Sequence, residues 1–394
     1  MSVSLFSGAL GLDLGLEQAG FQTSVAVELD KWCCATIRHN RPDLPLLNGD
    51  IREMDARSIL RAAGLRRREI DLVAGGPPCQ SFSTAGRRSS ISDARGGLFA
   101  DFARVVEYAQ PRFFVMENVR GILSAAIRHR PLNQRGLDQP PLKRDEKAGS
   151  ALRVIRRRLE DELGYQVVYG LVDAVNYGVP QFRQRVIFLG SRDREFKSWF
   201  GPDLRIDELL PPSHAEETTV ERPYRWRTLR DAVKGLRERK PEYMSYSDAR
   251  LRFLRLIPAG RNWRHLRTYG DDLVREALGG AYGSDGGKVG FFRRLTFDRP
   301  CPTVPATPIQ KGTSLCHPDE DRVLSVREYA RVQEFPDDWV LTGSTAEKYK
   351  QIGNAVPVGL GQAIGSALAA YLEESRPKAD VQPRDFAKTA GATV

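Results

Sequence analysis

The chain has 394 residues, which predicts two or three domains, and 41% of them are hydrophobic. No apolar run approaches the ~18 residues of a membrane span and no charged leader precedes the first expected strand, so we expect a soluble protein of the cytoplasm with no membrane partner. The five cysteines lack paired or metal-binding spacing, and the net charge of +10 favours a polyanion such as nucleic acid as partner, although good solubility would also explain it.

The first sixty residues contain a nucleotide-binding pattern. Residues 2–6 form an expected strand, residues 6–11 a glycine-containing turn and residues 12–19 a helix, and a second strand over 24–27 ends at Glu28. Glycine lets a ligand approach the backbone, and an acid at this distance from the turn can bind ribose hydroxyls. The spacing fits enzymes that use NAD as well as enzymes that use S-adenosylmethionine, so the pattern alone leaves the cofactor open.

A second feature is the loop Gly75-Gly76-Pro77-Pro78-Cys79-Gln80-Ser81-Phe82-Ser83, which follows a short buried strand over residues 71–74. Two glycines and two prolines predict a rigid turn, and the turn presents Cys79 at the carboxyl end of a strand, where open α/β sheets bind ligands. This position suits a nucleophile, although a small buried cysteine is the plain alternative. Cys33 and Cys34, adjacent on a helix expected over residues 31–40, are interpreted as structural.

Residues 84–97 have no hydrophobic period and form an expected loop. This loop could close over a phosphate backbone or simply be solvated, and it carries three basic residues: Arg87, Arg88 and Arg95. An amphipathic helix then begins at Leu98, and a strand over residues 113–116 ends at Glu117. If the two strands are neighbours, Cys79 and Glu117 reach the same cleft, whereas a role as helix cap would explain Glu117 alone.

The sheet is completed by a helix over residues 151–163 and by strands over 166–172 and 185–190. Arg183 and Arg185 alternate at the head of the last strand, so we expect their side chains to point the same way.

Two further segments flank this core. Residues 128–150 are rich in Arg, Pro, Gln and Gly and are expected to be a surface insertion, either ordered or disordered. A final helix over residues 358–373 carries an apolar stripe and is expected to pack beside the first helix.

Residues 191–325 have a different composition, with short apolar pieces, many glycines and prolines, and arginines beside aromatic residues, as in Gly290-Phe291-Phe292-Arg293-Arg294. This pattern predicts a second domain with little regular helix. Cations bind phosphates and aromatic rings stack on bases, so the pattern favours nucleic acid, with an Arg-rich surface over a few core aromatics as the alternative.

An ordered set of motifs resembles the DNA (cytosine-5)-methyltransferase family, of the bacterial modification type. In chain order the motifs are Phe6-Ser7-Gly8-Ala9-Leu10-Gly11, the Pro78-Cys79 loop, Glu117-Asn118-Val119, Gln181-Phe182-Arg183-Gln184-Arg185, Arg327-Glu328-Tyr329-Ala330-Arg331 with Phe335-Pro336, and Gln351-Ile352-Gly353-Asn354-Ala355-Val356. They cover about the first half of the chain and its last fifth, and leave a variable middle.

The resemblance implies an α/β fold, with a Rossmann-like S-adenosylmethionine-dependent methyltransferase domain, a mixed and mostly parallel sheet, and a smaller irregular target-recognition domain. It places the catalytic and cofactor-binding domain at residues 1–190, the target-recognition domain at 191–325, a hinge at 326–353 and the return of the chain at 354–375. Residues 376–394 are expected to be a flexible tail.

The resemblance also implies a role for individual residues. Cys79 is the expected covalent nucleophile at carbon 6 of a flipped-out cytosine, Glu117 the acid that engages ring nitrogen 3 with a raised pKa, and Arg183 and Arg185 support both. The residues expected to bind S-adenosylmethionine are Phe6, Gly8, Gly11, Glu28, Leu29, Asp50, Ile51, Pro78, Leu98, Asn354 and Val356. The residues expected to bind DNA are Gln80, Ser83, Arg87, Arg88, Arg95, Arg293 and Arg294.

The chain departs from the family pattern at two positions. Leu10 replaces the first of two adjacent glycines, and Leu29 replaces an aromatic residue that stacks on adenine, which leaves cofactor affinity open.

The expected reaction is transfer of a methyl group to carbon 5 of cytosine within a short duplex DNA sequence, by a monomer that needs no metal. A restriction endonuclease acting on the same site is a candidate partner. The alternatives are a tRNA methyltransferase of the same superfamily, whose Cys-Phe-Thr tripeptide is absent here, and a non-catalytic DNA-binding paralogue. An NAD-dependent oxidoreductase would explain only the first sixty residues.

Overall fold

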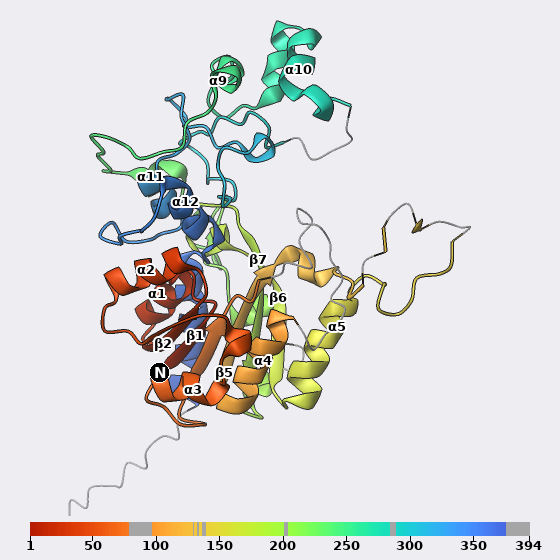
Figure 1. The fold of residues 1–394 in the computed structure, drawn as a ribbon, viewed down its shortest axis with the longest axis vertical. Helices are drawn as coiled ribbons and strands as arrows, with labels where there is room; N and C mark the ends of the chain where they lie inside the picture. The colour runs from red at the N-terminus through yellow and green to blue at the C-terminus, as the bar shows by residue number, and fades with distance from the viewer. Residues whose placement is uncertain are drawn as a thin grey trace, which may run out of the picture.

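A mixed sheet of seven strands lies at the centre of the computed structural model, which describes residues 1–78, 97–128, 130–131, 134–135, 139–200, 204–283 and 289–375 (Figure 1). The strand order is β3-β2-β1-β4-β5-β7-β6. The first five strands in this order pair in parallel, whereas β7 pairs antiparallel with β5 and β6. The prediction of a mixed, mostly parallel sheet is therefore confirmed. The strands are β1 Ser2–Leu5, β2 Thr23–Glu28, β3 Leu46–Asn48, β4 Leu72–Gly75, β5 Phe113–Val119, β6 Gln166–Asp173 and β7 Gln184–Ser191.

Helices cover both faces of the sheet, because the side chains of its central strands must be buried from water on both faces. One face packs against α1 (Gly11–Gln18) and α13 (Val358–Glu374), and the other against α3 (Ala56–Ala62), α4 (Leu98–Ala109) and α5 (Ser150–Arg157). The other helices are α2 Lys31–Asn40, α6 Phe196–Phe200, α7 Ile206–Leu209, α8 Leu229–Val233, α9 Asp248–Leu254, α10 Asp271–Leu278, α11 Val326–Val332 and α12 Thr345–Asn354.

The first and last helices pack very closely through glycines. A Cβ atom added at Gly15 would lie 2.1 Å from the carbonyl oxygen of Val358, and one added at Gly361 would lie 2.6 Å from that of Leu12. Larger residues at either position would force the helices apart. The expectation that the final helix lies beside the first is confirmed.

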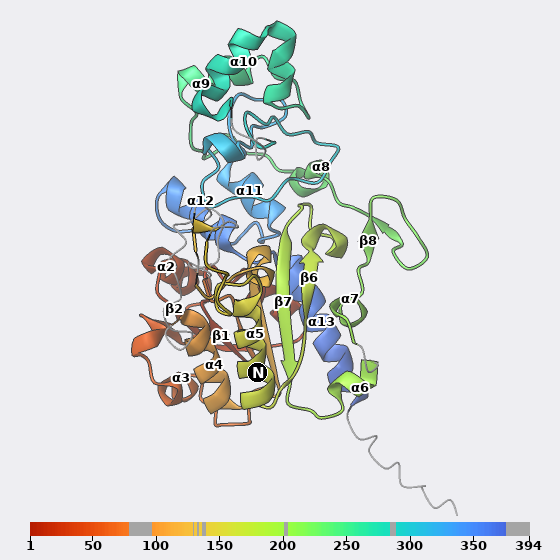
Figure 2. The same ribbon diagram turned by 90° about the vertical axis from the view of Figure 1, so that its right-hand side faces the viewer.

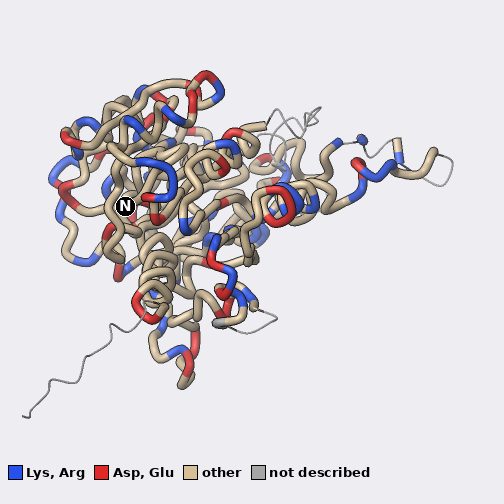
Figure 3. Tube along the Cα trace, turned by 90° about the horizontal axis from the view of Figure 1, so that it is seen from below, with Lys and Arg blue, Asp and Glu red and all other residues tan. Residues whose placement is uncertain are grey.

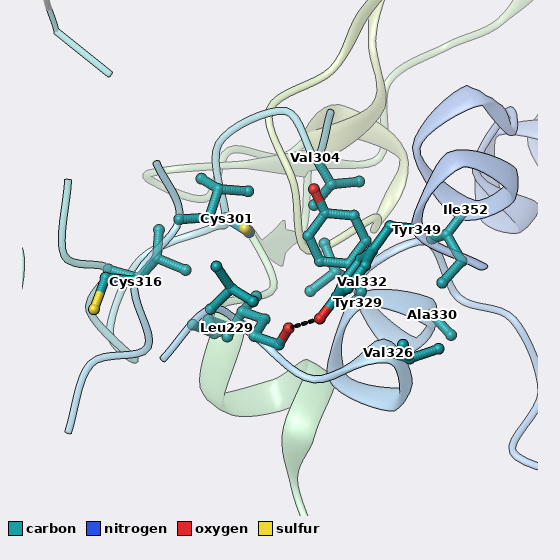
Figure 4. Close-up of a cluster of buried hydrophobic side chains, with 14 of the residues drawn as sticks. Leu229, Cys301, Val304, Cys316, Val326, Tyr329, Ala330, Val332, Tyr349 and Ile352 are labelled. Atoms are coloured by element: carbon teal, nitrogen blue, oxygen red, sulfur yellow. Dashed lines mark hydrogen bonds between the residues drawn. The ribbon is translucent and has the colours of Figure 1, made fainter. Parts of the chain in front are cut away.

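The middle of the chain forms an upper part, which carries α8, α9 and α10 (Figures 1 and 2). It contains short helices, whereas a pair of very short strands, β8 His214–Ala215 and β9 Tyr224–Arg225, lies beside the sheet below α8 (Figure 2). Helices α11 and α12 lie between this upper part and the sheet (Figure 2). Figure 4 shows part of the core there, where the rings of Tyr329 and Tyr349 meet edge to face with their centroids 4.9 Å apart. The Tyr349 hydroxyl donates to the carbonyl oxygen of Leu324 at 2.6 Å.

Two elements differ from the sequence prediction by more than two residues at one end. Strand β5 continues to Val119, because it pairs with antiparallel β7 along its whole length, so Glu117 lies inside the strand and not at its end. The helix expected over residues 151–163 is α-helical only to Arg157 and then becomes a π-helix, Arg158–Glu162. The tail expected after residue 375 lies outside the described residues.

One stretch, Thr345–Glu374, is long and apolar enough to cross a membrane by length and composition. It comprises α12 and α13, and 56% of its most apolar window is buried inside the protein. Since α13 packs against α1 and the sheet, this stretch is a core element of the fold.

Candidate functional site

A cavity of about 730 Å³ opens at the carboxyl ends of β1, β2, β4 and β5, where open α/β sheets bind ligands. It brings together every residue expected to bind the cofactor: Phe6, Gly8, Gly11, Glu28, Leu29, Asp50, Ile51, Pro78, Leu98, Asn354 and Val356. Glu117, Arg183 and Arg185 line the same cavity. Residues separated by most of the chain therefore share one site.

The turn after β1 is held in an unusual backbone conformation. Phe6, Gly8 and Leu10 all have positive φ angles, of 55°, 55° and 65°. For a residue with a side chain this conformation costs roughly 1–2 kcal/mol, and burial of the Leu10 side chain, only 1% exposed, offsets that cost. Position 11 cannot accept a side chain in the same way, because a Cβ atom on Gly11 would lie 2.4 Å from the carbonyl oxygen of Val356. The fold therefore accepts leucine at the first position of the expected glycine pair and requires glycine at the second.

The carboxylate of Glu28 is fixed in place by three backbone amides. Its Oε2 accepts from Gly8 at 2.7 Å, and its Oε1 accepts from Leu29 at 2.9 Å and from Asp30 at 2.8 Å. The remaining lone pairs can accept hydroxyl groups of a ligand without any rearrangement of the side chain. The side chain of Leu29 itself is 62% exposed, so it forms part of the rim.

Asp50 lies on the same cavity and is ionised at neutral pH. The Arg52 guanidinium and backbone amide donate to its carboxylate, and these bonds lower the pKa of Asp50 to about 2. Two fixed acceptors, Glu28 and Asp50, thus stand beside the apolar side chains of Phe6 and Ile51. This combination suits a ligand with hydroxyls and an amino-substituted aromatic ring.

At the other end of the cavity, Glu117 forms an ion pair with Arg185. Arg185 Nε lies 2.6 Å from Glu117 Oε1, and the two side chains are only 14% and 13% exposed. The neighbouring β4 loop packs directly on this pair, because a Cβ at Gly76 would lie 3.0 Å from Glu117 Oε2. Asn118 Nδ2 donates to the carbonyl oxygen of Pro77 at 3.1 Å, which fixes the start of the loop that continues to Cys79.

Arg183 also lines the cavity, but its contacts are those of a positioning residue. Its guanidinium is 1% exposed and donates to the carbonyl oxygens of Val304 at 3.2 Å, Gly353 at 2.8 Å and Ala355 at 2.9 Å. Desolvation, followed by the charge of Arg185, lowers the pKa of Arg183 well below its usual value. Arg183 and Arg185 share the cavity as expected, yet Arg183 ties the segment after α12 to β7, and Arg185 holds Glu117.

The expected DNA contact at Arg294 is wrong. This side chain is 6% exposed and donates to the carbonyl oxygens of Ile257, Leu254, His317 and Glu320, and its Nη2 also lies 2.6 Å from Asp321 Oδ1. All of its donor groups are used inside the upper part of the molecule, so none faces a nucleic acid. The neighbouring Arg293 is partly buried, and desolvation lowers the pKa of its guanidinium.

Several expected site residues lie outside the described residues. These are the nucleophile Cys79 and the expected DNA contacts Gln80, Ser83, Arg87, Arg88 and Arg95. The described chain reaches Pro78, on the cavity wall, and resumes at Gly97, next to Leu98 on the same wall. The expected roles of the residues between these points stay predictions.

Sequence reasoning missed several polar residues of the cavity, among them Asp13 and Lys350. Asp13 is 2% exposed, its Oδ1 has no hydrogen-bond partner, and desolvation raises the pKa of its carboxyl group to about 7. The sequence feature that could have indicated Asp13 is the presence of a single acid within the apolar run Leu12–Leu16. Lys350 on α12 pairs with Asp30 across the rim, with Nζ 2.7 Å from Oδ2, which links the N-terminal half of the site to the returning chain.

Comparisons with known proteins identify relatives over nearly the whole chain. A family model described as C-5 cytosine-specific DNA methylase matches residues 1–370. The type II methyltransferase M.Sau96I of Staphylococcus aureus is 36% identical over 369 residues, which are 94% of this chain and 75% of that protein. M.Eco47II of Escherichia coli is 36% identical over 375 residues, with coverage of 94% and 79%.

Solved structures agree with this match. A DNA modification methyltransferase encoded within an E. coli prophage superimposes with a TM-score of 0.61 at 25% identity, over 94% of this chain and 99% of that one. The Dnmt2 methyltransferase of S. pombe has a TM-score of 0.58 at 17% identity, over 95% and 98% of the two chains, which shows a shared fold.

Proposed function

This chain belongs to the family of C-5 cytosine-specific DNA methylases, and from that premise we propose how its residues carry out the reaction. The activity is that of a DNA (cytosine-5-)-methyltransferase. The observation that supports the assignment of roles best is the shared cavity, with Glu28 and Asp50 at one end and the Glu117–Arg185 pair beside the Pro78 loop at the other.

We propose that the cavity holds S-adenosylmethionine. The donors fit this molecule, because Glu28 and Asp50 offer carboxylates for the ribose hydroxyls and the adenine amino group, and Phe6 and Ile51 offer apolar faces for the ring. The position of a Cβ on Gly8 has no protein atom within 4 Å, so the turn leaves open space against which a ligand can lie. When bound, S-adenosylmethionine supplies the methyl group.

The thiolate of Cys79 is the proposed nucleophile. It adds to carbon 6 of the cytosine, which makes carbon 5 electron-rich enough to accept a methyl group. Loss of the proton from carbon 5 and then of the thiolate from carbon 6 releases the methylated base and the free enzyme. The target base must first leave the duplex, at a cost of a few kcal/mol.

Glu117 is the proposed contact for ring nitrogen 3, where negative charge would otherwise develop during addition of the thiolate. For this role the carboxyl group must share a proton with the base. Arg185 holds it in position from one side and the Gly76 backbone leaves room on the other. Arg183 acts indirectly. It donates to the carbonyl oxygens of residues 353 and 355, and so fixes the stretch that carries Asn354 and Val356 on the cofactor side of the cavity.

We also propose a division into domains, a set of DNA contacts and an oligomeric state for the protein. Residues 1–190 with 354–375 form the catalytic domain, residues 191–325 the target-recognition domain and residues 326–353 the hinge. Loop 84–97 and Arg293 contact duplex DNA at one short sequence. The protein acts as a monomer in a bacterial cytoplasm, and the type II names of its relatives suggest a restriction endonuclease that acts on the same sequence.

Expression in a bacterial host that lacks DNA methylation, followed by bisulfite sequencing, tests the proposal. We expect 5-methylcytosine at one short motif with the native chain and none with Cys79→Ala, although the variant still binds S-adenosylhomocysteine in calorimetry. Full methylation by the variant would rule out a covalent mechanism through Cys79. If the native chain binds the cofactor and leaves DNA unmethylated, the assay is repeated on tRNA.

A further inference from the structure

A strongly basic segment runs from the chain that follows strand β5 into the first turn of helix α5. We call residues 139–153 the basic segment; its base is joined to the chain that follows β5. The Ala151 amide donates to the carbonyl oxygen of Ala125 at 3.2 Å, and the Ile127 amide donates to Ser150 Oγ at 2.9 Å. Figure 1 shows the chain between β5 and α5 reaching out beyond the sheet and returning to α5.

The two acidic residues of the basic segment form ion pairs with arginines elsewhere in the protein. Glu146 is 7% exposed and receives two bonds from Arg130, at 3.3 and 2.5 Å, and one from the backbone amide of Lys143 at 2.8 Å. Asp145 pairs with Arg128, at 3.3 Å. Because both acids face arginines outside the segment, they hold the segment in shape and leave its own cations uncompensated.

Four exposed cations remain on the basic segment. They are Lys143, Arg144, Lys147 and Arg153, and within the described parts of the chain none of them forms an ion pair. Figure 3 shows the extended part of the chain marked mainly by lysine and arginine. Because Arg128 and Arg130, which lie outside the segment, pair with its acids, its own exposed cations are available to an external anion.

We propose that the basic segment binds the phosphate backbone of duplex DNA beside the target base, outside the recognised sequence. The inference rests on the proposed function. It follows from position, because the base of the basic segment is hydrogen-bonded to Ala125 and Ile127, which follow β5 and its Glu117 after a single turn of 3-10 helix, Arg120–Leu123. In this proposal, the duplex whose flipped base meets Glu117 runs on past this point. Separate cations on a protruding segment suit the regular spacing of phosphates and not one compact ligand.

The test compares two triple variants that remove equal charge. Lys143→Gln/Arg144→Gln/Lys147→Gln changes the basic segment, and Arg57→Gln/Arg61→Gln/Arg66→Gln changes exposed arginines on and after α3, at the far end of the sheet (Figure 1). Binding is measured by fluorescence anisotropy with S-adenosylhomocysteine present, on a 30-base-pair duplex of arbitrary sequence from 50 to 300 mM NaCl. Each lost phosphate contact lowers the slope of log Kd against log salt by about 0.9.

For the first variant we expect a slope smaller by about 2 to 3 and affinity at least tenfold weaker at 100 mM NaCl, and for the second no change. We also expect the first variant to keep the native kcat on long DNA with a raised KM. An unchanged slope in the first variant, or an equal loss in both, would overturn the proposal. If the native enzyme itself leaves DNA unmethylated, the proposed function fails, and that outcome is separate from the behaviour of the variants.

Discussion

Replacement of Asp13 by asparagine should remove a pH-dependent cost to stability. In the folded protein, desolvation raises the pKa of this carboxyl group from 3.8 to about 7, opposed by a hydrogen bond from Ser4 and assisted by the charge of Glu17. In the unfolded chain the group titrates near 3.8. The folded state therefore binds this proton more tightly, so the contribution of Asp13 to stability is greatest below pH 3.8 and falls as the pH rises from 3.8 to 7.

The size of the effect follows from the two pKa values. The difference between 3.8 and about 7 corresponds to about 4 kcal/mol at pH values above 7, at 1.36 kcal/mol for each pH unit. About 2–3 kcal/mol of this cost arises between pH 5 and pH 8, because at pH 5 the unfolded carboxyl group is already ionised. Asparagine keeps the size and cannot ionise, so any constant packing difference cancels between the two pH values.

The assay is urea unfolding of the native chain, Asp13→Asn and the exposed control Asp43→Asn, each at pH 5 and pH 8 without cofactor. Relative to the native chain, Asp13→Asn should gain about 2–3 kcal/mol of unfolding free energy on going from pH 5 to pH 8, and the control should gain less than about 1 kcal/mol. A stability difference for Asp13→Asn that stays constant with pH would refute the argument, since it would mean that the carboxylate is well solvated or paired.

Three further predictions concern the Glu117–Arg185 pair, the upper part and the contact between α1 and α13. Glu117→Gln should lower kcat by about 10²–10⁴-fold and leave the Kd for S-adenosylhomocysteine unchanged in calorimetry, because the amide cannot share a proton with the base; an unaltered kcat would exclude the proposed role. Arg294→Met should lower the unfolding free energy in urea by about 3–5 kcal/mol, because Asp321 and four carbonyl oxygens lose their donor. The DNA affinity of the folded fraction should stay native. Weaker DNA binding without loss of stability would show that Arg294 contacts DNA after all. Gly361→Val should destabilise the protein by about 1–3 kcal/mol in thermal unfolding and the exposed Ser366→Val by a few tenths, and equal effects would show that the close contact does not matter.

The strands and the cofactor turn could be predicted because their residues carry the information locally. Fully buried parallel strands are short apolar runs, and the acid at Glu28 stands at a strand end. The backbone of Leu10 could not be predicted, because residue preferences favour glycine in the left-handed region. Its conformation is set by tertiary burial of the leucine side chain, which no local pattern reveals.

The arginines show where local reasoning stops. Arg293 and Arg294 follow two phenylalanines, and the whole stretch resembles a nucleic-acid surface in sequence. The upper part has little regular structure, so many of its carbonyl oxygens have no helix or sheet partner. Arg294 satisfies four of them, and Arg183 does the same at the end of α12. Whether an arginine binds an outside anion or an inside carbonyl depends on contacts between distant segments.

The close contact between α1 and α13 has a consequence for protein synthesis. Phe6 and Gly8 leave the ribosome first, yet Asn354 and Val356, on the same cavity, leave it more than three hundred residues later. A nascent chain therefore cannot complete the proposed cofactor site, and a product that stops before α13 lacks the helix that packs against α1, which follows the first turn. We expect such fragments to be inert, so that methylation begins only when translation of the last helix has ended, and the abundance of truncated products has no influence on the methylation state of the cell.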